Sequence, residues 1–310
     1  MRITVAICTF NRAESLRRTL DSLAAMRVPD GLDWELVVVN NACSDHTDTV
    51  IQSFAAWLPI RRKSQPERGL ARARNLAVDA ARGDYIVWTD DDVVVGPDWL
   101  TAYAEAFQRA PEAAVFGGPI VARYEPPVPE WVRACEALLV GPYSTRDFGD
   151  EPQPISLGEG RVPFGSSFAL RAAEQRAFRY DPDLGPSPGR YRPHDETDVI
   201  EAILRSGATG YTVPLARVEH CIGQDRQTIG YVARWFVALG EADAFRDPES
   251  RGVVRWFGVP RWLWRKLIAA WVRYRLHRVV SPAPVWMRHL RDYSMARGAI
   301  RYWRSSARPG

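Results

Sequence analysis

The 310-residue chain has few cysteines, and none of them pair in the manner of a zinc or redox motif. Cys8, Cys43, Cys135 and Cys221 are far apart, and no two have CxxC spacing. This spacing argues against a zinc knuckle, a thioredoxin motif and a disulfide framework. We therefore expect four reduced cysteines, with Cys8 a small residue of the core.

Long hydrophobic runs are also missing. No stretch of 18 apolar residues occurs, so no helix is expected to span a bilayer. The N-terminal residues MRITVAICTF lack the longer apolar region and the small-residue cleavage site of a signal peptide. These absences predict a cytoplasmic protein. A composition of 46% hydrophobic and 25% charged residues is that of a globular chain and excludes a disordered or fibrous one.

Acidic residues are almost absent from the C-terminal segment 251–310. It contains fourteen Lys and Arg residues against Asp292 alone, a net charge of +13, whereas the whole chain has a net charge of +4. The same segment contains six of the twelve tryptophans. We therefore predict a boundary near residue 240 and a basic, Trp-rich helical extension over 241–310.

Two helices are predicted in this extension, one that begins at Pro260 and one over about 285–304. The first would have an apolar face and a basic face, with the residues Leu263, Trp264, Leu267, Ile268, Trp271 and Tyr274 opposite Arg261, Arg265, Lys266 and Arg273. Trp and Arg on an amphipathic helix are typical of elements that lie on membranes. We expect 251–310 to bind an anionic membrane surface, at the inner face of the plasma membrane. Packing on the catalytic core is the main alternative, and no nucleic-acid partner is expected.

Apolar, β-branched runs alternate with amphipathic segments over the first 121 residues. The pattern predicts strands at 3–9, 34–40, 60–64, 84–89 and 113–121, with helices between them. Such alternation predicts an α/β fold with a mostly parallel, doubly wound sheet. Ligands bind these sheets beyond the carboxyl ends of the strands.

Three polar clusters follow the ends of predicted strands and should meet at one edge of the sheet: Thr9, Asn11 and Arg12; Asn40 and Asn41; and Asp90, Asp91 and Asp92. Hard divalent cations take oxygen ligands, and Mg²⁺ often uses one or two carboxylates plus substrate phosphates. The spacing of Asp90 and Asp92 would put both carboxylates on the same side of an extended segment. We interpret the aspartates as a metal and phosphate site; a solvated acidic turn that caps the next helix is the alternative.

Three further sites carry weaker signals. The acidic segment HDETD (194–198) offers Glu196 and Asp195 as candidates for a general base, although acids at a helix start also serve as simple caps. In RGLARARNLA (68–77), Arg68, Arg72 and Arg74 could neutralise phosphate or form a solvated helix face. His220 follows a predicted strand, but a lone histidine is usually structural.

Five segments occur in the order seen in family 2 glycosyltransferases of the GT-A fold: VAICTFNR, VVVNNACSDHT, GLARARN, WTDDDVVVGPDWL and HDETDVIEAILRSG. The chain resembles that family over about residues 1–240. The resemblance implies a GT-A catalytic domain, with a nucleotide-sugar half over about 1–121 and an acceptor half over about 122–240. It also implies a nucleotide-sugar donor, a Mg²⁺ or Mn²⁺ ion, and transfer with inversion at the anomeric carbon.

The resemblance implies roles for individual residues. By the resemblance, Thr9 and Arg12 would line the nucleotide pocket, and Asp90 would lie near the ribose. Together with the strand-end and arginine clusters above, the predicted nucleotide-sugar ligands are Thr9, Asn11, Arg12, Asn40, Arg68, Arg74, Asp90 and Asp91. The predicted metal residues are Asp92, Asp90 and His220, with Asp92 the expected ligand and His220 placed to approach the metal or the diphosphate. Asn40 stands where many members have an aspartate that contacts the base, usually uracil, so a UDP-sugar is favoured while the base stays open. The family's catalytic Glu-Asp pair is reversed here, which makes Glu196 the expected base and Asp195 or Asp198 its rivals.

The sequence thus predicts a metal-dependent inverting glycosyltransferase that acts on a hydroxyl of a glycan or a lipid-linked acceptor. A nucleotidylyltransferase of similar fold is one alternative, but the segment CTFNRAESL (8–16) lacks the glycines of its usual phosphate loop. A non-catalytic scaffold that binds nucleic acid or membrane through 251–310 is the other. The loops at 122–162 and 179–193 would select the acceptor.

Overall fold

The computed structural model describes residues 1–157, 162–246 and 253–306. The chain divides into two compact units. Unit 1 comprises Met1–Arg123, Ser144–Arg190 and His194–Cys221, and unit 2 comprises Tyr124–Tyr143, Tyr191–Pro193 and Ile222–Gly310. Arg251 and Arg308 of the basic segment lie outside the described residues.

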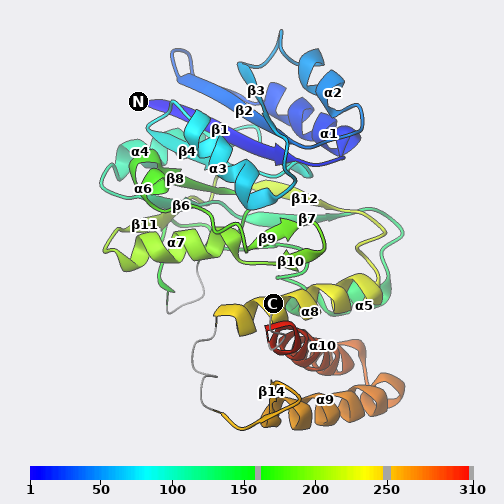
Figure 1. Cartoon of the computed structure of the whole chain (residues 1–310). Coiled ribbons are helices and arrows are strands. Elements are labelled where there is room, and N and C mark those ends of the chain that lie inside the picture. The colour runs from blue at the N-terminus through cyan, green and yellow to red at the C-terminus, as the bar shows by residue number, and fades with distance from the viewer. Residues whose placement is uncertain (158–161, 247–252, 307–310) are drawn as a thin grey trace. The chain divides into compact units, whose positions relative to one another are not determined.

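A seven-stranded sheet forms the centre of unit 1 (Figure 1). Its spatial order is β11-β6-β8-β4-β1-β2-β3, with β1 (Arg2–Thr9), β2 (Asp33–Asn41), β3 (Ile60–Gln65), β4 (Tyr85–Trp88), β6 (Val115–Gly117), β8 (Phe168–Arg171) and β11 (Gly210–Thr212). Only β8 is antiparallel to its neighbours, β4 and β6. The other pairs are parallel. The prediction of a mostly parallel α/β sheet is confirmed.

Alternate residues of the central strands are buried on opposite faces of this sheet. Val5 and Val38 belong to one hydrophobic cluster, and Ala6 and Val39 belong to another. The first cluster includes residues of α1 (Ala13–Ala24), α2 (Thr47–Ser53) and α4 (Trp99–Arg109), and the second includes residues of α3 (Leu70–Ala80), α6 (Ala172–Ala177) and α7 (Asp195–Arg205). Burial on both faces explains why these strands are continuous apolar runs in the sequence.

The predicted strand over 113–121 is two strands in different sheets. Its first part is β6, whereas β7 (Ile120–Tyr124) joins a three-stranded sheet with β5 (Val93–Val95) and β12 (Val218–Ile222), in the order β5-β12-β7. Pro119 lies at the break and has no N–H to continue a ladder. A Cβ on Gly118 would lie 2.1 Å from the Ala216 carbonyl oxygen, so only glycine fits there. A short pair, β9 (Gly185–Ser187) and β10 (Arg190–Arg192), follows β8 along the chain.

Unit 2 is mainly helical. It contains α5 (Glu130–Ala134), a 3₁₀ turn (Glu136–Leu138), α8 (Ile229–Arg246), α9 (Arg261–Val280) and α10 (Ala283–Ser306), with a small hairpin of β13 (Arg255–Trp256) and β14 (Val259–Pro260). The predicted helices beginning at Pro260 and near 285 are confirmed as α9 and α10. The expectation of a continuous loop over 122–162 was wrong for 130–138, where α5 and the 3₁₀ turn lie.

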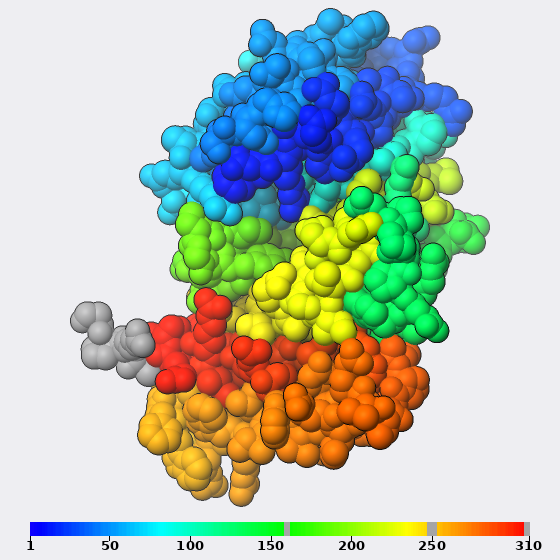
Figure 2. Space-filling model, turned by 90° about the vertical axis from the view of Figure 1, so that its right-hand side faces the viewer, coloured from blue at the N-terminus to red at the C-terminus, as the bar shows by residue number. Residues whose placement is uncertain are grey.

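Helix α10 lies between α8 and α9, as the ribbon and the space-filling view both show (Figures 1 and 2). At its crossing with α8 the two backbones are in direct contact. A Cβ on Gly240 would lie 2.1 Å from the Met295 carbonyl oxygen, and a Cβ on Gly298 would lie 1.9 Å from that of Val237. The glycines are therefore required by the close approach of the two helices.

Two predicted absences concern the whole described chain. None of the four cysteines forms a disulfide, and Cys135 is buried while the other three are partly buried. Among the described helices, none is both long enough and apolar enough to cross a membrane.

Candidate active site

The three aspartates lie between β4 and β5 in unit 1. The carboxyl end of β1 adjoins that of β4, since Ala6 is in register with Trp88. The Thr9 hydroxyl donates a hydrogen bond of 2.7 Å to Asp91 Oδ2. Arg12 Nη1 lies 3.0 Å from Asp91 Oδ1 and 2.9 Å from Asp92 Oδ2, so one guanidinium bridges two adjacent carboxylates. The two strand ends therefore meet as predicted.

The charge of this cluster is negative even with Arg12 included, because two carboxylates share one cation. Burial raises the pKa of Asp91 to about 6; Arg12 opposes this rise, and the neighbouring Asp92 adds to it. Asp91 in turn raises the pKa of Arg12, with a smaller effect from Asp92. A site with excess negative charge and little water favours a further cation.

His220 lies next to Asp92. On β12 it is in register with Val93 of β5, and this pairing brings its Nε2 to 3.4 Å from Asp92 Oδ1. Both side chains are buried. The sequence could not distinguish this histidine from a structural one, because the pairing of β12 with β5 leaves no local signal.

A divalent cation fits the donor set of Asp92 and His220. The described residues contain no group of three or more His, Cys, Asp or Glu side chains arranged to hold a metal. One carboxylate and one imidazole are nevertheless suitable donors for an ion that takes its other ligands from water and substrate phosphates. The residues that would hold such an ion are Asp92 and His220.

A second charged cluster surrounds Arg74 of α3. Its Nη1 lies 2.6 Å from Asp195 Oδ2 and 3.6 Å from Glu196 Oε2, and its Nη2 lies 3.8 Å from Asp90 Oδ1. The guanidinium carbon also lies over the ring of Tyr180, 5.3 Å from the centroid. Three carboxylates from two acidic segments thus converge on one buried arginine.

Asp195 and Glu196 differ in burial and in partners. The Asp195 side chain is 5% exposed, and burial raises its pKa to about 7; Arg74 opposes the rise and the Glu196 charge adds to it. The Glu196 side chain is 16% exposed, and its Oε1 accepts a hydrogen bond of 3.2 Å from the Gly165 N–H. Glu196 is therefore the carboxylate that a bound molecule can reach, while Asp195 is held by Arg74.

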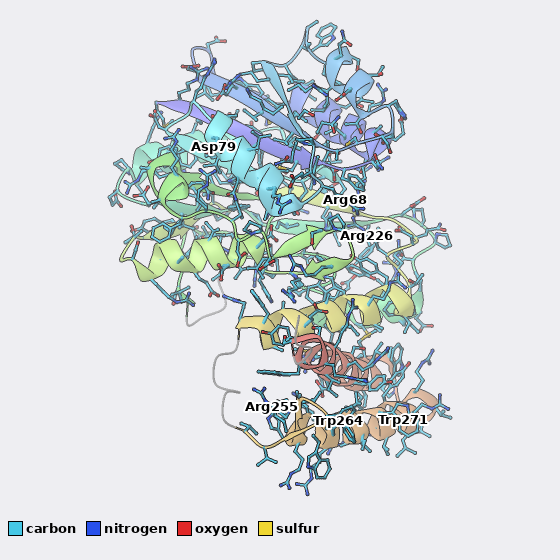
Figure 3. All side chains as sticks on the ribbon, in the orientation of Figure 1. Arg68, Asp79, Arg226, Arg255, Trp264 and Trp271 are labelled. Carbon is cyan, nitrogen blue, oxygen red and sulfur yellow. The ribbon has the colours of Figure 1, made fainter. Side chains whose placement is uncertain are left out.

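The other predicted ligand residues occupy separate positions. Asn11 Oδ1 accepts a hydrogen bond of 2.7 Å from the Ser44 N–H, and Asn40 Oδ1 accepts one of 2.8 Å from the Cys43 N–H. Both asparagines thus form hydrogen bonds to the segment that follows β2, and these bonds do not involve the aspartates. Arg68 precedes α3 (Figure 3). Its guanidinium carbon lies 3.9 Å from the ring centroid of Phe10. It lines a cavity of about 360 Å³ formed by 67–72 and by residues between 182 and 190.

The sequence did not predict that two residues of this region, Ser166 and Gly165, lie at the site. The Ser166 hydroxyl donates a hydrogen bond of 2.6 Å to Asp90 Oδ2. A Cβ on Gly165 would lie 3.0 Å from Arg74 Nη2, so glycine leaves room for the buried guanidinium. The run Gly165–Ser167 of small residues inside an apolar segment was the available signal.

Residues 4–171 match the family model described as Glycosyl transferase family 2. The chain belongs to this family. It is therefore a glycosyltransferase, and the resemblance seen in its sequence motifs is confirmed. The match includes both the aspartate segment and Arg74 but ends before Asp195.

Curated relatives extend the likeness beyond residue 171. The succinoglycan biosynthesis protein ExoM of Rhizobium meliloti is 29% identical over 238 residues, which are 76% of this chain and 71% of the relative. The glucosyl-dolichyl phosphate glucuronosyltransferase of Haloferax volcanii is 25% identical over 225 residues, which are 71% and 69% of the two chains.

Solved structures show the same GT-A fold. The mannosyltransferase PcManGT of Pyrobaculum calidifontis, in complex with GDP-Man and Mn²⁺, matches with a TM-score of 0.58 at 19% identity over 97% of this chain and 86% of its own. Residues 1–349 of S. aureus TarS, in complex with UDP-GlcNAc, match with a TM-score of 0.57 at 16% identity over 97% and 92%. This glycosyltransferase therefore has the predicted fold with a helical C-terminal part.

Proposed function

We propose that this family 2 glycosyltransferase is metal-dependent and inverting, and that it moves a sugar from a nucleotide-sugar donor to a hydroxyl of a glycan or lipid-linked acceptor. One observation carries the proposal: unit 1 holds both an Asp92–His220 pair at 3.4 Å and a Glu196 carboxylate beside a buried Asp195–Arg74 ion pair. These groups would supply a site for charged phosphate and a site for a base in the same unit.

The donor would be bound by the residues at the ends of β1 and β4. Asp92 and His220 would hold Mg²⁺ or Mn²⁺, which when bound neutralises the charge that develops on the leaving nucleoside diphosphate. Arg12 fixes the carboxylates of Asp91 and Asp92 in place. Asp90, the most exposed of the three aspartates, would face the ribose. Arg74 would approach the phosphates. The positions of Asn11, Asn40 and Arg68 suit the nucleoside end, and a UDP-sugar stays the favoured donor.

Glu196 would act as the general base. The acceptor oxygen attacks the anomeric carbon from the face opposite the phosphate, the bond to the phosphate oxygen breaks, and the hydroxyl proton passes to Glu196. Because bond formation and bond cleavage occur on opposite faces, the configuration inverts. Asp195, already paired with Arg74, would position Arg74 and Glu196. Asp198 lies one helical turn further along α7 and is the less favoured base.

The acceptor is proposed from the relatives. One relative is named for succinoglycan biosynthesis and another for a dolichyl phosphate, so a polysaccharide or a lipid-linked glycan is the acceptor class that we favour. A lipid-linked acceptor is held at a membrane. We therefore extend the proposal to a cytoplasmic protein associated peripherally with the inner face of the plasma membrane.

The test is nucleotide release from UDP-, GDP- and dTDP-sugars, measured with Mn²⁺, with Mg²⁺ and with EDTA. We expect slow hydrolysis of one donor, which EDTA abolishes. Donor binding is measured in parallel by calorimetry, since turnover can require the acceptor. A chain that binds no nucleotide sugar in the presence of either metal would refute the proposal, and hydrolysis that continues in EDTA would refute its metal dependence.

A further inference from the structure

Exposed apolar side chains are concentrated in one part of unit 2. Of the sixteen large hydrophobic residues that are exposed in the described chain, eleven lie between Val253 and Val280. A soluble protein normally exposes such residues singly, and a contiguous set marks a surface that binds something. This segment therefore has a function beyond packing within unit 2.

Helix α9 carries four of these residues as a stripe. Ile268, Val272 and Leu276 are four residues apart and Val279 follows three later, which places them on one side of the helix. Ile268 is 61% exposed, Leu276 63% and Val279 84%. We define these four residues as the α9 stripe.

The opposite side of α9 packs within unit 2. Leu263 lies in an apolar cluster with Val259, Ile300 and Trp303. Further along, the ring of Tyr274 stacks on that of Tyr293 of α10, with 6.3 Å between the centroids. Helix α9 thus packs on α10 through the side that carries Leu263 and Tyr274, and the α9 stripe lies outside this contact.

The sequence expectation for this helix needs correction. Ile268 and Trp271 were expected on the face of Leu263, yet both are exposed. Side chains such as Trp262 and Val272 made the two faces hard to separate in the sequence, because apolar and basic residues alternate around most of the helix. The packed face is in fact narrow, and the outward face is mixed.

The outward face of α9 is strongly basic. Arg261–Val280 contains six Lys and Arg residues and no acid. Arg265, Lys266 and Arg273 are all exposed beside the α9 stripe. A surface with this charge repels a second copy of itself and attracts a negatively charged partner.

An aromatic turn adjoins the beginning of α9. Trp256 and Phe257 are exposed, and Phe257 is 88% exposed at the tip of the β13–β14 hairpin. The Arg261 N–H donates a hydrogen bond of 3.0 Å to the Val254 carbonyl, and Trp264 Nε1 donates one of 3.2 Å to the Trp256 carbonyl. Figure 3 shows Arg255 in this hairpin and Trp264 and Trp271 along α9. The turn is thus attached to the helix.

We propose that the α9 stripe and the Trp256–Phe257 turn form a docking surface for an anionic lipid bilayer. The apolar and aromatic side chains would enter the boundary between headgroups and acyl chains, and the adjacent Arg and Lys side chains would contact lipid phosphates. A nucleic acid would pair with the cations and could stack on Phe257, but it would leave the aliphatic side chains of Leu276 and Val279 in water. The proposal deepens the peripheral membrane position proposed above and specifies the residues that carry it.

The test is sedimentation of the full chain with vesicles of phosphatidylglycerol and phosphatidylcholine, and with vesicles of phosphatidylcholine alone. We expect binding to the anionic vesicles only, with an affinity that falls as salt rises, because exposed charges are screened within about 10 Å at 0.1 M salt. Absence of binding to anionic vesicles, or equal binding to both kinds, would overturn the proposal.

Two variants with matched controls identify the surface. Ile268→Gln with Leu276→Gln should weaken vesicle binding at least about tenfold, whereas Trp57→Gln with Leu215→Gln, at exposed sites in unit 1, should leave it unchanged. Arg265→Gln, Lys266→Gln and Arg273→Gln together should weaken it about a hundredfold, whereas Arg17→Gln, Arg18→Gln and Arg109→Gln should change it little.

Donor hydrolysis without vesicles shows that each variant is folded. A variant that hydrolyses the donor but does not bind vesicles has lost the docking surface alone, so the test is independent of the proposed transfer reaction. Vesicle binding that survives both α9 variants would overturn the docking surface. So would a change of oligomeric state in the stripe variant, measured by light scattering, since that result assigns the stripe to a second copy of the chain. Tight, salt-sensitive binding of single-stranded nucleic acid without vesicle binding would overturn it as well.

Discussion

Arg74 and Asp195 form a buried ion pair between α3 and α7, with 2.6 Å between Nη1 and Oδ2 and 5% of each side chain exposed. The two residues are 121 positions apart in the chain. Because desolvated charges are costly without a partner, each requires the other. Their contact ties the acidic start of α7 to the helix that follows β3, and so brings Glu196 to the same guanidinium that Asp90 approaches.

We expect Arg74→Met to destabilise the protein by about 3–5 kcal/mol, because it leaves Asp195 buried without its cation. The pKa of Asp195 in the folded protein is about 7, above the ordinary 3.8, so the folded state binds this proton more tightly than the unfolded chain does. The stability that the bound proton contributes is complete below about pH 4 and is lost as the pH rises through 7. Removal of Arg74 raises this pKa further. Urea unfolding should therefore show a larger loss at about pH 8 than at about pH 5. A loss independent of pH would contradict this account, and Arg179→Met, at an exposed ion pair with Asp79, is the control.

Glu196→Gln should lower kcat by about 10²–10⁴-fold, because the amide cannot accept the acceptor proton. Donor binding, measured by calorimetry, should stay within about threefold of the wild type, since the proposed role of Glu196 is to take the proton of the acceptor hydroxyl and not to hold the donor. The matched change Glu201→Gln, on the same helix α7, should have little effect on either quantity. Normal turnover of the Glu196 variant would move the role of base to Asp195 or Asp198.

Asp92→Asn should reduce turnover at least about a hundredfold through lost metal affinity. Calorimetric titration with Mn²⁺ in the presence of nucleotide should show the lost metal affinity independently of activity. His220→Ala should weaken Mn²⁺ binding by about tenfold. Asp79→Asn, at an exposed carboxylate of α3 (Figure 3), is the control for the change of charge. Unchanged Mn²⁺ affinity in both site variants would show that the ion is held elsewhere.

Gly298→Ala should destabilise unit 2 by about 2 kcal/mol, because its Cβ would lie 1.9 Å from the Val237 oxygen and the helices would have to separate. Gly230→Ala in α8 is the control: its Cβ meets only the end of the Arg234 side chain at 3.4 Å, and alanine favours the helix. Thermal unfolding followed by circular dichroism measures both. Equal melting temperatures for the two variants would contradict the backbone contact.

The sequence predicts the central strands because runs such as ELVVVN are buried on both sheet faces and contain few polar residues. It also predicts the meeting of Thr9 and Arg12 with the aspartates, since carboxyl ends of neighbouring parallel strands share an edge. The antiparallel β8 between β4 and β6 could not be foreseen, because nothing in Phe168–Arg171 specifies its neighbours.

Side-chain direction at the site was less predictable. Asp90 and Asp92 were expected on one side of an extended segment, but β4 ends at Trp88 and the chain turns. Asp90 accepts a hydrogen bond from the Ser166 hydroxyl, whereas Asp92 accepts one from the Arg12 guanidinium. The alternation of side chains holds only within a strand. The amide of Asn40 is used by Cys43 and Asp48, which lie within eight residues of it. Such local bonds depend on loop geometry that composition does not reveal.

The glycine contact between α8 and α10 has an entropic consequence for the outward face of α9. Backbones in direct contact fix α10 against α8, and α9 in turn packs on α10 through Leu263 and Tyr274. Where α9 ends before α10, His277 Nδ1 lies 2.8 Å from Ser281 Oγ. The basic face is therefore ordered before it meets any partner. An unstructured basic tail would lose about 1–2 kcal/mol of backbone freedom for each residue that became fixed on docking. A face that is already rigid avoids this loss, so few contacts can suffice for reversible attachment.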